Sequence, residues 1–420
     1  MIRTMPSRPL PFLLVLTLAA SSATAADGDW PQFLGPARNN VAAPGELLDA
    51  WPASGPPVAW KSDVGQGFSG PVVAGERAVL FHRVGNEEVV ECLAAATGER
   101  RWAAKYPTQY RDDFGFDEGP RSTPAIDGGR VYTFGAEGKL HSWELETGKQ
   151  VWTVDTRADF HTDKGFFGVA CSPLVEGDVV VLNVGGKQGA GVVAFDKATG
   201  KVRWKATDDE AGYASPVAAT VGGRRYVFAF NRAGLAALDS KDGAVRFRFP
   251  WRSRSQASVN AATPLVVDDL VFLSASYGTG AVLLRVTPDG KPQEVWGGDE
   301  SLSNHYATSV HRDGFLYGFD GRQEYGPRLR CVELKTGKVR WSEEGFGAGT
   351  LLLAGDRLLV LKDNGELVSA PATPEKFAPT GRAKILPSEC RAHPALARGL
   401  FYARDKTTLV CVDLRRDGKR

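Results

Sequence analysis

The chain has 420 residues, 43% of them hydrophobic and 24% charged, a composition that is typical of a folded globular protein and excludes a disordered one. Lys and Arg number 51 and Asp and Glu 49, and this near balance excludes the basic surface of a nucleic-acid-binding protein. Glycine is abundant (48 residues) and methionine scarce (2), which favours short strands joined by tight turns.

The first 26 residues have the pattern of a signal peptide. Arg3 and Arg8 precede an apolar stretch at residues 10–20, and a small-residue Ala-Thr-Ala cleavage signal follows at residues 23–25. The stretch is too short for a membrane span, and no later segment is apolar enough to be a transmembrane anchor. No cysteine follows the cleavage signal, so a lipid anchor is not expected. These features predict a periplasmic or secreted protein.

Residues 27–55 are predicted to form an N-terminal arm, and residues 56–420 a single repeat domain. The repeat is clearest at residues 143–152 (WELETGKQVW), 195–204 (FDKATGKVRW) and 332–341 (VELKTGKVRW). Its closing aromatic residues stand 42 to 52 positions apart and are Trp60, Trp102, Trp152, Trp204, Phe247, Trp296 and Trp341. A period of this length indicates an array, a solenoid or a propeller.

Each unit is predicted to contain four antiparallel strands. A small residue, any residue and usually a proline open the first strand, because proline is tolerated where a strand begins. The third strand ends at the Thr-Gly turn, whose glycine supplies the positive φ that such turns need. The fourth strand carries the closing aromatic residue. The predicted strand openings are Pro71, Pro124, Pro173, Pro216, Pro264, Ser309, Thr350 and Pro394.

The first and last units complete each other. Trp60 is a closing aromatic residue with no unit before it, whereas the last unit ends near Leu414 without one. We therefore expect residues 58–61 to supply the outer strand of the last blade, which closes the ring without an open sheet edge. The predicted fold is all-β: an eight-bladed β-propeller of four-stranded antiparallel blades, closed by an N-terminal strand.

Four of the five cysteines align with small residues in other copies of the repeat. Cys92, Cys331 and Cys411 share one position of the third strand, and Cys171 stands two residues before a strand-opening proline. Equivalent positions in different blades lie beyond disulfide reach, so these cysteines are predicted to be free structural thiols. Cys390 has no counterpart that would place it.

These strand openings, the Asp-x-x-Thr-Gly-Lys-x-x-Trp endings and the eight units resemble the pyrroloquinoline-quinone-type (PQQ-like) repeat propellers. The segment WPQFLGP at residues 30–36 also resembles an opening that is common among exported bacterial proteins of this group. One branch of the family consists of quinoprotein dehydrogenases, which hold the quinone PQQ and calcium in the central funnel. Another is non-catalytic and includes the propeller subunit of the outer-membrane β-barrel assembly machinery.

The resemblance is closer to the non-catalytic branch. Quinoprotein dehydrogenases are usually longer and carry adjacent cysteines beside the cofactor, and no two cysteines are adjacent here. No motif for the calcium ligands or a catalytic aspartate is evident, and no nucleophile elbow, metal-binding motif or phosphate loop is present. We predict no catalytic or metal-binding residues and assign no cofactor, with PQQ and calcium as the alternative.

Residues just before the strand openings are predicted to converge on one mouth of the channel. The predicted ligand-binding rim consists of Phe68, Arg121, Tyr213, Arg254, Asn260, His305, Tyr306 and Arg391. Arginine offers a planar fork of donors, and aromatic rings offer flat stacking surfaces. Together they would suit a planar anion or an acidic peptide end. The alternative is that these are ordinary solvated residues of a channel mouth.

Two long loops precede the second and third openings. Residues 106–119 and 156–170 are rich in carboxylates, which could ligate calcium, but their spacing does not match a calcium loop and favours a solvated acidic loop. Residues 320–324 (DGRQE) fall outside the repeat and are expected to lie away from the rim, as a surface salt-bridge patch.

The sequence thus predicts an exported, monomeric propeller scaffold that binds a protein or peptide of the cell envelope at its loop face. The alternative is a quinone- and calcium-dependent oxidoreductase that uses the central funnel. A carbohydrate-binding or carbohydrate-cleaving propeller is a third hypothesis, which would need a carboxylate pair across the mouth.

Overall fold

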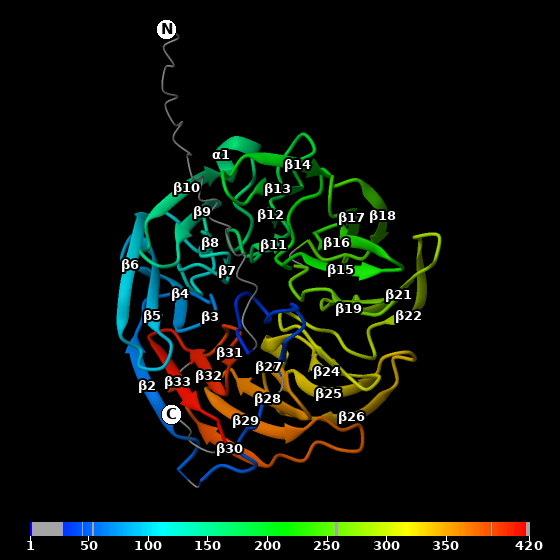
Figure 1. Ribbon diagram of the computed structural model, residues 1–420. Helices are drawn as coiled ribbons and strands as arrows, with labels where there is room; N and C mark the ends of the chain where they lie inside the picture. The colour runs from blue at the N-terminus through cyan, green and yellow to red at the C-terminus, as the bar shows by residue number, and fades with distance from the viewer. Residues whose placement is uncertain (2–27, 44, 53, 257–258, 388, 417–420) are drawn as a thin grey trace.

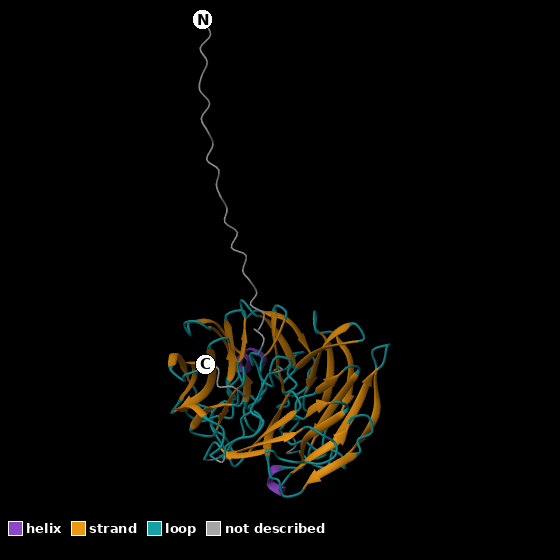
Figure 2. Ribbon diagram, turned by 60° about the horizontal axis from the view of Figure 1, so that its bottom comes forward, coloured by secondary structure: helices purple, strands orange, loops and turns teal. Residues whose placement is uncertain are grey.

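The computed structural model describes residue 1 and residues 28–416, except 44, 53, 257–258 and 388. The predicted signal peptide therefore lies outside the described residues apart from Met1. Eight antiparallel sheets surround a common axis, which confirms the predicted eight-bladed propeller (Figure 1). In the described part, helix is confined to α1 (Thr156–Phe160) and the 3₁₀ turn η1 (Gln323–Tyr325), and the remainder is strand and loop (Figure 2).

The first four blades each contain four consecutive strands. Blade one is built from β3 (Val72–Ala74), β4 (Arg77–Val84), β5 (Glu87–Ala94) and β6 (Arg100–Pro107). Blade two is built from β7 (Ala125–Asp127), β8 (Arg130–Phe134), β9 (Lys139–Glu144) and β10 (Gln150–Asp155). Blade three is built from β11 (Leu174–Glu176), β12 (Val179–Asn183), β13 (Val192–Asp196) and β14 (Val202–Ala206). Blade four is built from β15 (Val217–Val221), β16 (Arg224–Phe230), β17 (Gly234–Asp239) and β18 (Val245–Pro250).

The last four blades include the two that use N-terminal strands. Blade five is built from β19 (Leu265–Val267), β20 (Leu270–Ala275), β21 (Gly280–Val286) and β22 (Pro292–Gly298). Blade six is built from β23 (Val310–Arg312), β24 (Phe315–Asp320), β25 (Arg328–Glu333) and β26 (Val339–Glu343). Blade seven is built from β27 (Gly349–Ala354), β28 (Arg357–Lys362), β29 (Glu366–Pro371), β30 (Gly381–Lys384) and the added β1 (Val41–Ala42). Blade eight is built from β31 (Ala395–Ala397), β32 (Leu400–Arg404), β33 (Thr408–Asp413) and β2 (Val58–Asp63).

The innermost strand of each blade starts where the sequence predicts it. Seven of them begin one residue after the predicted opening, and β27 begins at Gly349, one residue before Thr350. The closing strand is also confirmed: β2 pairs antiparallel with β33, with Trp60 opposite Cys411. The ring is therefore closed by hydrogen bonds between the two ends of the propeller domain.

The Thr-Gly and Trp parts of the repeat meet between neighbouring blades. The indole N–H of Trp60 donates to the carbonyl of Ala95 in blade one at 2.9 Å. Gly98 of that turn has a φ of +74°, and a Cβ there would lie 2.6 Å from the Trp60 ring. Only glycine meets both conditions. The same indole-to-carbonyl bond joins later blades through Trp102, Trp152, Trp296 and Trp341.

The cysteines occupy buried positions of the blades. Cys92, Cys171, Cys331 and Cys411 are buried free thiols, as the repeat alignment predicts, and Cys390 is also buried. Burial raises the pKa of Cys92 to about 11, so this thiol is protonated at neutral pH.

The first part of the N-terminal arm, residues 30–38, lies in the central channel, which the sequence did not indicate. Trp30 forms backbone bonds with Val73 of β3, and the Pro31 carbonyl accepts from Ile126 of β7 at 2.7 Å. The Arg38 guanidinium donates to the carbonyls of Ser172 and Pro173 at the start of β11. In Figure 1 this dark-blue segment crosses the centre of the ring. The arm then adds β1 in parallel to β27, so blade seven has five strands rather than the predicted four.

Candidate functional site: an aromatic funnel at the loop face

One cavity of about 390 Å³ opens at the end of the channel where the innermost strands begin. Six of the eight predicted rim residues line it: Phe68, Arg121, Tyr213, His305, Tyr306 and Arg391. Four phenylalanines from the two long loops line it as well: Phe114, Phe116, Phe166 and Phe167. We call this cavity the funnel. Its volume lies in the range of small-ligand pockets.

Two arginines flank one aromatic ring at the side of the funnel formed by blades eight, one and two. The guanidinium carbon of Arg391 lies 5.3 Å from the centre of the Phe68 ring, and that of Arg121 lies 5.4 Å from it. Arg121 also lies 5.4 Å from the ring of Phe167, and Arg391 lies 5.0 Å from that of Phe116. Cation–π contacts of this kind fix the arginine planes against the funnel wall.

The first long loop is organised by Asp112, not solvated as the sequence predicts. Its side chain is fully buried and accepts backbone N–H bonds from Phe114, Phe116 and Asp117 at 3.2, 2.8 and 3.0 Å. Arg121 Nη2 approaches it at 3.2 Å. Burial raises the pKa of Asp112, but these backbone donors and Arg121 outweigh it and hold the pKa below its usual value. Asp112 therefore turns Phe114 and Phe116 toward the funnel.

We expect Asp112→Asn to lower the free energy of unfolding by about 2–3 kcal/mol, because an amide nitrogen would face donors that now bond to a carboxylate. Urea denaturation measures this loss, and limited proteolysis within residues 106–119 should become faster. The matched control is Asp113→Asn next to it. Asp113 is 60% exposed and pairs with Lys164, so its loss should cost under about 1 kcal/mol. Equal effects of the two substitutions would contradict the role of Asp112.

The second long loop is held by Tyr213 of the predicted rim. Its hydroxyl accepts the backbone N–H groups of Phe166 and Phe167 at 2.8 and 3.1 Å. Phe167 then contacts Phe114 of the first loop, with ring centres 5.2 Å apart. Tyr213 is thus a positioning residue for the loop as well as part of the wall.

The four loop phenylalanines form one continuous aromatic surface, which we call the mouth cluster. Phe114 is 55% exposed and Phe116 is 40% exposed, whereas Phe166 and Phe167 are half-buried beneath them. The rings of Phe114 and Phe166 lie 6.2 Å apart, and those of Phe116 and Phe167 lie 6.1 Å apart. Exposed phenylalanines on an ordered loop mark a binding surface more often than scattered aliphatic residues do.

The wall of the funnel at blade six, which we call the sixth-blade wall, includes residues 322–324. They belong to a segment that was predicted to lie away from the rim. Arg322, Gln323 and Glu324 line the funnel, so the expectation for residues 320–324 was wrong. The Arg322 guanidinium lies 4.3 Å from the centre of the Tyr277 ring, and Tyr277 bonds to His305 at 3.0 Å. The chain returns to the axis here because the Gly321 N–H donates to the Ser303 carbonyl.

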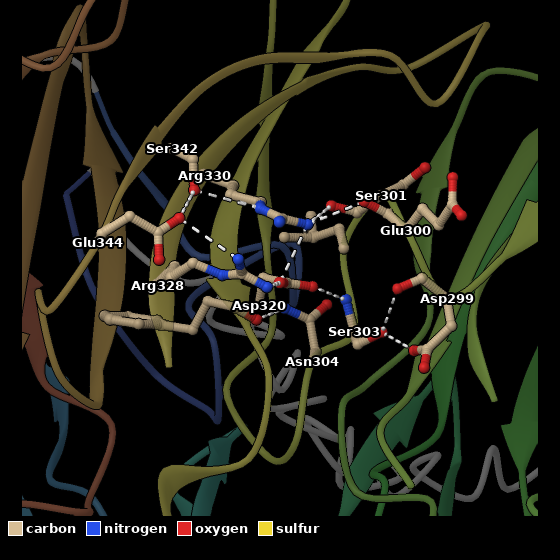
Figure 3. A network of polar contacts seen from close by, with 12 residues as sticks. Asp299, Glu300, Ser301, Ser303, Asn304, Asp320, Arg328, Arg330, Ser342 and Glu344 are labelled. Atoms are coloured by element: carbon tan, nitrogen blue, oxygen red, sulfur yellow. Dashed lines mark hydrogen bonds and ion pairs between the residues drawn. The ribbon is translucent and has the colours of Figure 1, made fainter. Parts of the chain in front are cut away.

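A buried ionic network stands behind this wall (Figure 3). Asp320 is 4% exposed and accepts from the Ser303 N–H at 2.8 Å and from Arg328 at 2.9 Å, and it forms an ion pair with Arg330 at 3.0 Å. Arg330 also donates to the carbonyls of Glu300 and Ser301 at 2.9 and 2.8 Å. The network fixes the segment that leads into His305 and Tyr306.

The floor of the funnel combines the arm with the innermost strands. Phe33 of the arm packs edge-on against His393, with ring centres 5.0 Å apart. His393 stands at the middle position of its strand opening, where blades two to six carry hydroxyl residues. Those hydroxyls link neighbouring blades: the Thr123 N–H donates to Ser172 Oγ at 2.9 Å, and the Ser172 N–H donates to Ser215 Oγ at 2.8 Å. The floor is therefore fixed by the arm and by bonds between blades.

Burial keeps the funnel histidines neutral. It lowers the pKa of both His393 and His305 to about 4. The unfolded chain binds protons on histidine below about pH 6.5, so the free energy of unfolding should fall between pH 6.5 and pH 4. Each such histidine contributes about 1.4 kcal/mol per pH unit. Denaturation of His393→Gln across this range should show a shallower dependence than the parent, and an unchanged slope would contradict the neutral assignment.

Two predicted rim residues do not line the funnel. Asn260 is buried, and its amide donates to the carbonyls of Asn231 and Trp251 at 2.8 and 3.1 Å, so it joins two loop segments. It borders a smaller neighbouring cavity of about 210 Å³. Arg254 is exposed at the surface beside Ser255, which does line the funnel. Arg254 therefore precedes by one residue the position of this loop that faces the funnel.

The residues present do not fit a calcium ion of the dehydrogenase type. In the described part of the chain no three His, Cys, Asp or Glu side chains are placed to hold a metal. Glu324 is the carboxylate that lines the funnel, and it pairs with Arg322 at 3.3 Å. The aromatic walls and arginines would suit the planar quinone alone.

Fold and site together define an eight-bladed propeller with an aromatic, arginine-containing funnel at its loop face. A family model described as outer membrane protein assembly factor BamB matches residues 85–343. This match covers more than half of the chain, which therefore belongs to that family. Between residues 28 and 416, with the gaps noted above, no helix has the length and apolar character needed to cross a membrane.

Individual relatives come from both branches. BamB of Yersinia pestis is 21% identical over 255 residues, which cover 59% of this chain and 62% of BamB. The quinohemoprotein alcohol dehydrogenase ADH-IIG of Pseudomonas putida is 30% identical over 167 residues, but these cover 38% of this chain and 21% of the dehydrogenase. The structure of BamB from Moraxella catarrhalis superposes with a TM-score of 0.61 at 16% identity, over 87% of this chain and 98% of that one. The chain thus spans less than two thirds of the length of either curated relative.

Proposed function

We propose that this protein is a non-catalytic binding scaffold of the cell envelope, exported to the periplasm or secreted, that takes a protein or peptide partner at its loop face. The mouth cluster is the observation that carries the proposal. Phe114 and Phe116 are exposed, yet the buried Asp112 fixes their loop, so a partner would meet a preformed apolar surface. A preformed surface loses little conformational entropy on binding.

The family and the curated relative support the same function. BamB of Yersinia pestis is named an outer membrane protein assembly factor, and a scaffold needs no catalytic groups. Each funnel arginine pairs with a carboxylate, which holds these side chains in fixed positions on the wall that a partner would meet.

The test is affinity capture from a native envelope extract with the purified propeller. We expect the double variant Phe114→Ser, Phe116→Ser to lose the partner that the parent captures. The matched control is Val202→Ser, Val245→Ser, which removes two valines that are 45% and 44% exposed on outer strands. Equal capture by the parent and the phenylalanine variant would contradict the proposal.

A quinone-dependent oxidoreductase is the second candidate, and the 30% identity to the Pseudomonas putida dehydrogenase over 167 residues favours it. Arg121 and Arg391 would hold carboxylates of the quinone, and Phe68 would stack on its plane. Titration with PQQ, with and without calcium, followed by absorbance tests this candidate. Micromolar binding would support it, and no uptake at that level would exclude it.

A further inference from the structure

We propose that the funnel admits one large aromatic side chain, a tryptophan or tyrosine, from an extended segment of the partner. The segment's backbone lies across the mouth cluster while the aromatic ring enters the cavity. This inference rests on the proposed scaffold function and specifies the chemistry that the scaffold recognises.

The charges of the funnel favour a neutral occupant over an anionic one. Arg121 pairs with Asp112, Arg322 with Glu324, and Arg391 with Glu389. Asp112, Glu324 and Glu389 therefore offset most of the positive charge of the three arginines, although Glu389 also pairs with Lys406 at 2.9 Å. A polyanion would have to compete with these carboxylates for the arginines, whereas a neutral ring would not. Each guanidinium keeps its face against aromatic rings, which suits another ring better than a carboxylate.

The shape of the funnel provides room for a ring on one side. The rim position carries bulky residues in blades one, two and four, Phe68, Arg121 and Tyr213, but small ones in blades three and five, Ala170 and Ala261. Blade five lies opposite blade one in an eight-membered ring, so Ala261 faces Phe68 across the channel. A ring placed beside Ala261 would meet Phe68 and the two guanidinium groups stacked on it. Aromatic pairs of this kind stabilise beyond the area they bury.

The rigidity of the walls favours an inserted side chain over closure of the loops. Asp112 holds the first loop and Tyr213 the second, while Phe33 and His393 close the floor. Binding interfaces concentrate their affinity in aromatic anchors that enter such preformed pockets. The exposed rings of Phe114 and Phe116 then cover the backbone beside the anchor and exclude water from it.

The experiment measures binding of acetylated, amidated peptides of sequence Gly-Ser-X-Ser-Gly by ligand-observed NMR. We expect the peptide with X = Trp to bind about tenfold more tightly than those with X = Leu or X = Glu, a ratio that corresponds to ~1.4 kcal/mol. Ala261→Trp, which fills the funnel, should remove this preference. The matched control Val202→Trp places the same residue on an exposed outer strand and should keep it.

Ala170→Trp fills the funnel from blade three and serves as the second variant where Ala261→Trp does not fold. Equal binding of the Trp and Leu peptides, tighter binding of the Glu peptide, or an unchanged preference in folded funnel-filling variants would overturn the inference. If capture from the extract still depends on Phe114 and Phe116 in that case, the scaffold function stands without an aromatic anchor. Peptide preference without capture supports the aromatic funnel and removes the scaffold function.

Discussion

Trp30→Ala is expected to lower the free energy of unfolding by about 3–5 kcal/mol, the range for truncating a buried tryptophan. Trp30 is 1% exposed and packs with Val73, Ala354 and Leu396 in the core shared by blades one, seven and eight. Its ring also covers Gly35, where a Cβ would lie 3.0 Å away. Loss of the ring leaves a cavity in the centre of the propeller that the rigid innermost strands cannot close. Urea denaturation measures the effect.

The control for this prediction is Trp51→Ala in the same N-terminal arm. Trp51 is half-buried and packs on Gly381 at the periphery of blade seven, so its truncation should cost less than half as much. Trp30→Phe should retain most of the stability because it keeps a ring in the same place. A loss of under about 1 kcal/mol for Trp30→Ala would show that the arm is not part of the core.

The position of the N-terminal arm could not be predicted from the sequence. Residues 30–36 resemble a family opening, but they share no pattern with the blades, and a segment outside the repeat has no register that would place it. Its position depends on contacts such as Arg38 with the carbonyls of Ser172 and Pro173, which are 134 residues away or more. Backbone carbonyls as partners give no sequence signal.

The blades were predictable because each local feature recurs. The closing tryptophan bonds to and packs on the Thr-Gly turn of the next blade, as Trp60 does with Ala95 and Gly98. The residue before a strand-opening proline bonds to its counterpart in the next blade, as Thr123 does with Ser172. Because these contacts repeat around the ring, they fix the positions of the innermost strands and hence of most rim residues. Phe68, Arg121 and Tyr306 could therefore be placed at the funnel without a structure.

The loops were less predictable because side chains, not periodicity, set their course. The phenylalanines of the mouth cluster stand in the sequence as aromatic pairs in two long loops: Phe114 and Phe116, and Phe166 and Phe167. No periodicity predicts that the two pairs meet, and the carboxylates around them favour a solvated loop. Asp112 instead binds its own loop, a role that depends on three backbone N–H groups coming together.

Asp320→Asn is expected to lower the free energy of unfolding by about 3–5 kcal/mol, the cost of removing one partner from a buried ion pair. The amide keeps the shape and can still accept the Ser303 N–H. However, it leaves Arg330, which is 9% exposed, without the charge that balances it. Arg328 is 38% exposed and can turn toward Glu344, so most of the loss should come from Arg330. Urea denaturation measures the loss, and faster hydrogen exchange at residues 303–306 would show that it reaches the funnel wall.

A double-variant cycle separates this buried pair from the surface charges around it. Asp320→Asn combined with Arg330→Met should be less destabilising than the sum of the two single changes, because it removes the unpaired charge together with its partner. Glu344→Gln is the matched control, since Glu344 is 69% exposed and meets the same network through Arg328 at 3.3 Å. Its loss should cost under about 1 kcal/mol. Additive effects of Asp320→Asn and Arg330→Met would show that the two side chains do not stabilise the sixth-blade wall as a pair.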